Sequence, residues 1–153
     1  MYIRSMDAEK IEGRKTQARA WFETLRDEIC AAFMDIQPIN PGHLLVVPVN
    51  HAAYLSELEQ EDAAQVFRVA QRLAAALRRS AVKCEGVNLF LADGEAAMQE
   101  VFHVHLHVVP RFAGDGFGLK FPATYFQKPE REELNEIAEE IRHRLEVEGM
   151  ETK

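Results

Sequence analysis

The segment Phe102–Pro110 restricts what this 153-residue chain can fold into more than any other, because histidine and apolar residues alternate along it. Successive side chains of a β-strand point to opposite faces, so every second residue lies on the same face. One face would carry imidazoles about 7 Å apart between successive Cα atoms, from His103, His105 and His107. The other face would be apolar, formed by Val104, Leu106 and Val108. The pattern predicts a strand over 100–110 with the core on one side and three imidazoles on the other.

Two kinds of chemistry suit three imidazoles on one strand face, where half of the six histidines gather. Imidazoles two residues apart can bind zinc, although three collinear side chains seldom converge on one ion. Alternatively, a neutral imidazole can attack phosphorus if one nitrogen is free and an acceptor holds the other N–H. Neighbouring imidazoles disfavour the charged form of the middle ring and can donate to phosphate oxygens. From these residues two functions remain: nucleophilic catalysis by the middle imidazole, His105, and a zinc-dependent hydrolase that uses the histidine strand.

The rest of the chain predicts an α+β fold with a mostly antiparallel sheet, because strands and helices follow one another in groups. Short β-branched runs predict strands over 44–48 and 86–91. A long helix is expected over 56–79, with Ser56 as its N-cap, acidic residues in its first turn and arginines at its end. Its apolar stripe consists of Val66, Phe67, Ala70, Leu73, Ala74 and Leu77. A last helix is expected over 130–147.

Residues 17–36 are ambiguous. Apolar residues recur there at helical spacing, which slightly favours a helix. A hairpin fits as well, with strands over 20–25 and 29–34 around a turn at 26–28.

Composition excludes several classes of protein. The net charge of −7 argues against broad binding to nucleic acid, which needs many lysines and arginines against phosphates. The two cysteines, Cys30 and Cys84, are too few for a disulfide scaffold and are expected to be buried thiols. No apolar run is long enough to span a membrane, and the N-terminus has no apolar core of a signal peptide. A cytoplasmic protein without membrane or nucleic-acid partners is expected.

The pattern His-apolar-His-apolar-His-apolar-apolar resembles the signature of the histidine triad, or HIT, family. Asn88, Gly94, Gln99 and Val101 precede the triad as similar residues do in bacterial members. Upstream, the segment 33–43 and the strand that ends at Pro48 resemble the other main motif of the family. Downstream, 110–112 and the glycine-rich 114–118 resemble a bacterial subgroup. The resemblance covers about residues 20–125.

The resemblance implies a HIT-like fold with a five-stranded sheet, one long helix and a C-terminal helix. It favours the hairpin over the helix for 20–34. The expected organisation is a poorly defined segment 1–19, a HIT domain over 20–125 and a C-terminal helix and tail over 126–153. Family members commonly pair through the long helix and an edge strand, so the resemblance also implies a homodimer.

For the reaction, the resemblance implies that His105 attacks the α-phosphorus of a nucleotide and forms a nucleotidyl-histidine, from which water releases a nucleoside monophosphate. His107 and Gln99 would contact the phosphate. His103 would support the region of His105, and His43 would buttress the triad from the neighbouring strand or serve only as a buried hydrogen-bonding residue.

For the nucleotide, the resemblance implies that Asp35 accepts hydrogen bonds from the ribose hydroxyls, and that Ile36 and Phe33 flank the nucleoside. Asn88 is assigned to the nucleotide site, with a strand-end cap as its alternative role. The expected ligand is a purine nucleotide, and no cofactor or metal is expected to be required. The cysteine pair that binds a structural zinc in some members is absent.

Two departures from the family suggest another function. Ala92 stands where many members carry Asn or Gln, and Met98 stands where glycine usually precedes the glutamine. Because glycine allows the backbone to approach a phosphate closely, both changes could narrow the phosphate pocket. A nucleotide-binding module with little or no catalysis is therefore the alternative to a hydrolase or transferase.

Overall fold

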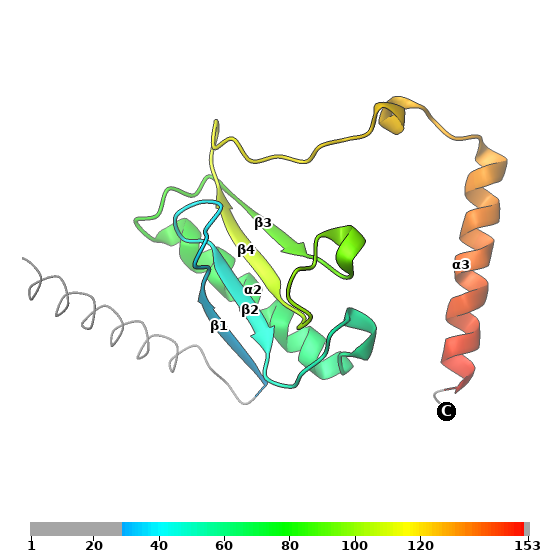
Figure 1. The fold of residues 1–153 in the computed structure, drawn as a ribbon, viewed down its shortest axis with the longest axis horizontal. Helices are drawn as coiled ribbons and strands as arrows, with labels where there is room; N and C mark the ends of the chain where they lie inside the picture. Colours follow the sequence, from blue (N-terminus) through cyan, green and yellow to red (C-terminus); the bar gives the residue numbers. More distant parts are fainter. Residues whose placement is uncertain (1–28, 152–153) are drawn as a thin grey trace, which may run out of the picture. The chain divides into compact units, whose positions relative to one another are not determined.

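The computed structural model describes residues 29–151, and these belong to two compact units that divide between Phe117 and Gly118. The first unit holds a β-sheet with the long helix α2 across one face (Figure 1). The second holds a short 3-10 helix, η3 (Ala123–Phe126), and the helix α3 (Arg131–Glu151). The predicted domain boundary at 125/126 stays a prediction.

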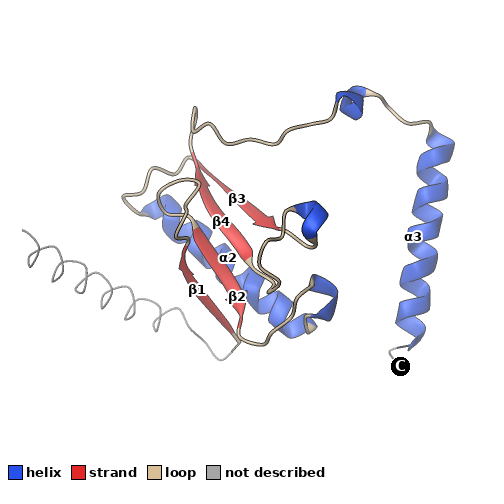
Figure 2. Ribbon diagram, in the orientation of Figure 1, coloured by secondary structure: helices blue, strands red, loops and turns tan. Residues whose placement is uncertain are grey.

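The described part of the sheet has four antiparallel strands in the order β1-β2-β4-β3 (Figure 2). They are β1 (Cys30–Met34), β2 (Leu44–Pro48), β3 (Gly86–Leu91) and β4 (Leu106–Arg111). The strand predicted over 29–34 is confirmed against the helical periodicity, because β1 pairs with β2 from Cys30↔Pro48 to Met34↔Leu44. The other predicted strand of that hairpin, 20–25, lies outside the described residues.

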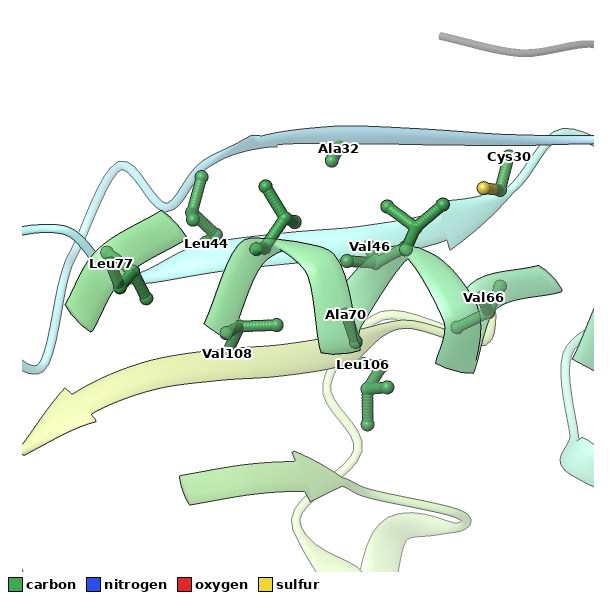
Figure 3. Close-up of a cluster of buried hydrophobic side chains, with 11 residues drawn as sticks. Cys30, Ala32, Leu44, Val46, Val66, Ala70, Leu77, Leu106 and Val108 are labelled. Carbon is green, nitrogen blue, oxygen red and sulfur yellow. The ribbon is translucent and has the colours of Figure 1, made fainter. Parts of the chain in front are cut away.

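The core lies between the sheet and α2 (Gln60–Arg79), whose inward residues recur at helical spacing (Figure 3). Alternate residues of three strands face this helix, and they are Cys30, Ala32, Leu44, Val46, Leu106 and Val108. The helix contributes Val66, Val69, Ala70, Leu73 and Leu77. Phe67 was predicted to belong to this stripe, but it is 60% exposed and Val69 lies inward instead. With one face of the sheet covered by α2, the polar side chains of the strands must lie on the opposite face.

The helix predicted over 56–79 starts later, so Ser56 is not its N-cap. A 3-10 turn, η1 (Leu55–Glu57), comes first, and extended backbone at Leu58 and Glu59 separates it from α2. The Glu57 carboxylate accepts the N–H groups of Ala53 and Tyr54, which fixes this turn. A local side-chain bond of this kind competes with helix formation, and sequence periodicity does not show it.

The strand predicted over 100–110 is shorter, because regular pairing begins only at Leu106. The ladder with β2 runs from Leu44↔Val108 to Val46↔Leu106, and continuing the same register would place Val47 opposite His105 and Pro48 opposite Val104. Proline has no N–H to donate, so the ladder stops there. Val104 instead donates its N–H to the carbonyl of Ala52, beyond the end of β2. His103 and His105 therefore lie in an extended loop, and only His107 lies in the strand.

The helix α3 of the second unit runs four residues beyond the predicted end at 147. Its apolar residues are largely exposed, and they are Leu134, Ile137, Ile141 and Leu145. Among the described helices none is both long and apolar enough to cross a membrane.

Candidate functional site

A row of side chains crosses the face of the sheet opposite α2, and His107 lies at its centre. The strand register places Phe33 beside Leu45, Leu45 beside His107, and His107 beside Phe90. These residues alternate with the core residues of each strand, so all four point away from α2. The Phe90 and His107 rings are 5.8 Å apart between centroids. The row forms an apolar floor with one imidazole in it.

His43 lies immediately before β2, and its imidazole contacts that of His107. Its Nε2 is 2.9 Å from His107 Nδ1, and it is only 1% exposed. The backbone N–H of Ile39 points to His43 Nδ1 at 3.2 Å. Because an N–H donates, Nδ1 of His43 must be the unprotonated nitrogen, and its Nε2–H then donates to His107 Nδ1. A neutral His107 therefore carries its proton on Nε2, which is the nitrogen left for a ligand.

Burial keeps both of these imidazoles neutral. The pKa of His107 falls to about 4, first because of desolvation and then because of the neighbouring His105 and His43. Desolvation also lowers the pKa of His43, and the nearby Asp35 carboxylate partly opposes this. A neutral His107 can offer one N–H to an anion without adding a positive charge to the site.

This pKa shift predicts a loss of folding stability in mild acid. The unfolded chain takes up a proton on His107 near pH 6.5 and the folded chain only near pH 4, so the free energy of unfolding falls as pH drops between those values. Urea unfolding at pH 7, 5.5 and 4.5 measures it, and His107→Gln should flatten the profile because glutamine does not titrate. A profile equally steep in the variant would contradict the assignment.

His105 is held by the backbone, which fixes its tautomer. Its Nδ1 lies 2.7 Å from the carbonyl oxygen of His103, and a carbonyl can only accept. Nδ1 therefore carries the proton and Nε2 keeps a free lone pair. The His105 and His107 rings stand edge to face with centroids 4.9 Å apart. The two rings thus present a lone pair and an N–H side by side.

His103 joins the loop that carries His105 to the end of β2. Its Nε2 donates to the carbonyl of Pro48 at 3.0 Å, which places its own Nδ1 as an acceptor. His51 fills that acceptor, with its Nδ1 at 3.1 Å from His103 Nδ1. The sequence analysis did not predict a role for His51. Its position three residues after the predicted strand 44–48, which pairs beside the histidine strand, could have indicated that it lies near the triad. Five of the six histidines thus belong to this site or its support.

The residues predicted to contact the nucleoside lie at the end of β1. Asp35 follows β1 directly, and its carboxylate is 3.5 Å from His43 Nδ1 and 17% exposed. Its other oxygen accepts the N–H of Gln37 at 2.7 Å. Ile36 is 97% exposed, and Phe33 is half-buried in the row beside Leu45. Asp35, His43 and His107 are therefore brought together, with Phe33 in the floor beside them.

Both polar atoms of the Gln99 side chain, and the side-chain oxygen of Asn88, bond within the protein. Gln99 is 3% exposed, accepts the N–H of Gly94 at 2.7 Å and donates to the carbonyls of Ala53 and Val101. In this conformation it organises the loop 92–105 from inside. The Asn88 carbonyl accepts from Arg111 at 2.9 Å near the other end of β3.

The two departures from the family differ in their structural consequences. Ala92 is buried at 3% exposed. Met98 adopts a left-handed backbone, with φ of 69°, and its side chain is 74% exposed. Glycine adopts this conformation without strain, whereas a side chain costs about 1 to 2 kcal/mol. The left-handed backbone conformation at position 98 is therefore a reason of its own for glycine there, besides the close approach of a phosphate.

One set of possible metal ligands occurs among the described residues. Ligand atoms of Asp35, His43 and His107 lie within 4.8 Å of one another. In this arrangement, however, the His43 and His107 nitrogens already bond to each other, and Ile39 occupies the remaining nitrogen of His43. A metal ion bound here would have to break the hydrogen bonds from Ile39 to His43 and between His43 and His107. These three possible ligands also differ from the three imidazoles, His103, His105 and His107, that a zinc hydrolase would use.

Known proteins share this fold and these motifs. The HIT domain family model matches residues 21–114. A HIT family protein from Bacillus anthracis is 35% identical, covers 77% of this chain and 83% of its own, and has a TM-score of 0.70. A histidine triad nucleotide-binding protein from Candida albicans is 27% identical, covers 80% of this chain and 86% of its own, and has a TM-score of 0.69. The adenosine 5'-monophosphoramidase HNT1 of Saccharomyces cerevisiae is 32% identical over 126 residues, or 82% of this chain and 75% of that protein. With a family model over more than half of its length and a matching fold, the chain belongs to the HIT family.

Proposed function

We propose that this protein binds a purine nucleotide and cleaves its nucleotidyl group at the α-phosphate through a covalent bond to His105. The observation that carries the proposal is the 2.7 Å contact between His105 Nδ1 and the His103 carbonyl. It leaves Nε2 with a free lone pair, which is the requirement for an attack on phosphorus. The names of the yeast monophosphoramidase and the Candida nucleotide-binding protein support a nucleotide as the substrate.

In the first step, His105 Nε2 forms a bond to the α-phosphorus, and the bond from phosphorus to the leaving amine or phosphate breaks. The leaving group takes the electron pair of that bond, and a leaving amine also takes up a proton from solvent, so that it departs as a neutral amine. The substituted imidazole becomes positively charged, and its Nδ1–H remains bonded to the His103 carbonyl, which stabilises the charge. In the second step, water attacks phosphorus and loses a proton to solvent, the N–P bond breaks with its electron pair returning to His105 Nε2, and the nucleoside monophosphate leaves.

The other residues of the site would bind and orient the substrate. His107 would donate its Nε2–H to a phosphate oxygen as charge develops there. Asp35 would accept from the ribose hydroxyls, and Phe33 would provide an apolar surface beside the nucleoside. Gln99 would reach a phosphate only after its three internal bonds break.

A binding protein with little catalysis is the second candidate, and the position of Gln99 favours it. A phosphate site that lacks the glutamine amide has fewer donors to stabilise the transition state. Tight nucleotide binding without turnover would support this candidate.

The test is mass spectrometry of the protein mixed with adenosine 5'-phosphoramidate and quenched in alkali, where an N–P bond survives. The expected result is a mass gain of one adenylyl group that maps to His105. Binding of adenosine monophosphate without any adduct or turnover would refute covalent catalysis and leave the binding protein.

A further inference from the structure

A buried carboxylate ties the glycine-rich loop after β4 to the loop between β1 and β2. The side chain of Asp115 is 4% exposed, and both of its oxygens bond to the Arg111 guanidinium, at 2.6 and 2.8 Å. The backbone N–H groups of Phe112 and Phe117 also donate to it. The Arg111 ion pair, assisted by these bonds, holds the pKa of this carboxyl far below its usual range. Asp115 is therefore a rigid, charged acceptor.

Asn40 connects this acceptor to the other loop. It is 5% exposed, and its amide group donates to Asp115 and to the carbonyl of Pro110, both at 2.9 Å. Its own carbonyl accepts the N–H of His43 at 3.0 Å. The backbone at residues 39–40 is thus anchored to the end of β4 on one side and to His43 on the other.

That backbone carries the N–H which decides the tautomer of His43. The Ile39 N–H donates to His43 Nδ1 at 3.2 Å, while the Asp35 carboxylate lies 3.5 Å from the same nitrogen. The Ile39 N–H and the Asp35 carboxylate favour opposite tautomers of His43. The N–H can donate only to an unprotonated Nδ1, whereas the carboxylate can accept only from a protonated Nδ1. With Ile39 in place, His107 carries its proton on Nε2. If His43 Nδ1–H turned to Asp35 instead, His43 Nε2 would accept from His107 Nδ1–H, and His107 Nε2 would be bare.

We propose that Asn40, Asp115 and Arg111 form a positioning cluster that holds the Ile39 N–H on His43 and so selects the Nε2–H tautomer of His107. The cluster touches no substrate. It acts through the backbone of residues 39–40 and then through two imidazoles in series. Its structural role stands independently of the proposed function, and only its effect on catalysis rests on that function.

The direct test is nitrogen-15 NMR of the histidine side chains in the free, full-length protein at pH 7, where protonated and bare ring nitrogens have well-separated shifts. In the wild type, His43 and His107 should both carry the proton on Nε2. In Asn40→Ala, the anchor is lost and both rings should move toward the Nδ1–H form. Asp115→Asn, which keeps the size of the side chain but loses its charge, should move them in the same direction and serves if Asn40→Ala does not fold.

Two further variants separate positioning from general loosening. Val66→Ala opens space in the core on the opposite face of the sheet, so it should reduce stability without moving either tautomer. In the double variant Asn40→Ala/Asp35→Ala, the second substitution removes the carboxylate that stabilises the Nδ1–H form of His43. The double variant should therefore return both rings toward the wild-type tautomers.

The kinetic consequence, if the protein hydrolyses adenosine 5'-phosphoramidate, is a kcat about tenfold lower in Asn40→Ala with KM changed less than about twofold. A donor that acts mainly in the transition state affects kcat in this way. Wild-type tautomers in a folded Asn40→Ala, or an equal change in Val66→Ala, would overturn the proposal. Because the NMR result needs no turnover, it distinguishes failure of this inference from failure of the proposed function.

Discussion

Replacement of His105 by alanine is expected to lower kcat for adenosine 5'-phosphoramidate hydrolysis by a factor of roughly 10⁴ or more, as losing a nucleophile does. The physical reason is the free lone pair on Nε2, which exists because the His103 carbonyl holds the proton on Nδ1. Alanine leaves only direct attack by water. Nucleotide affinity should change little, because the predicted nucleoside contacts lie at the end of β1. The measurements are steady-state kinetics and calorimetric titration with adenosine monophosphate.

The control is His143→Ala, which removes an exposed imidazole of α3 in the second unit and should leave kcat unchanged. Added imidazole should restore part of the activity of His105→Ala, since a free imidazole can occupy the space and attack phosphorus. A His105→Ala protein that keeps more than a tenth of the wild-type kcat would refute covalent catalysis by this residue.

Replacement of Gly42 by alanine is expected to lower the free energy of unfolding by about 3 kcal/mol, through two effects. The φ of Gly42 is +94°, a conformation in which side chains are strained by about 1 to 2 kcal/mol. A Cβ there would also lie 2.9 Å from a Val82 methyl and 3.3 Å from a Leu77 methyl, and overpacking costs about 1 to 3 kcal/mol. Urea unfolding monitored by circular dichroism measures the change.

Gly114→Ala separates the two effects. Gly114 also has a positive φ, of +77°, but nothing lies within 4 Å of the position its Cβ would take. It should therefore show only the backbone strain, about 1 to 2 kcal/mol. Equal losses in the two variants would mean that the packing around Gly42 relaxes freely.

The homodimer, the cytoplasmic location and the absence of a required cofactor stay predictions. The purine nucleotide and the roles of the nucleotide-contacting residues stay proposals.

Much of the fold followed from sequence pattern, because hydrophobic periodicity reports which residues face the core. The apolar runs at 44–48 and 86–91 placed β2 and β3, and the helical stripe from Val66 to Leu77 placed α2. The alternation after Phe102 predicted a strand there, but regular pairing begins only at Leu106. At 29–34 the same reasoning was wrong on its own, since short apolar runs satisfy both helical and extended spacing. Pairing with β2 determined that segment, and pairing is not visible in a single stretch of sequence.

The sequence by itself determined that the chain carries three alternating imidazoles, an acidic residue after a strand and the motifs of the HIT family. Only the tertiary structure decided which nitrogen of each ring carries the proton. That choice depends on acceptors and donors distant in sequence, such as the Pro48 carbonyl for His103 and the Ile39–His43 pair for His107. The structure also turned the Gln99 amide inward and joined Asn40 to Asp115, because hydrogen bonds between loops form only when folding brings those loops together.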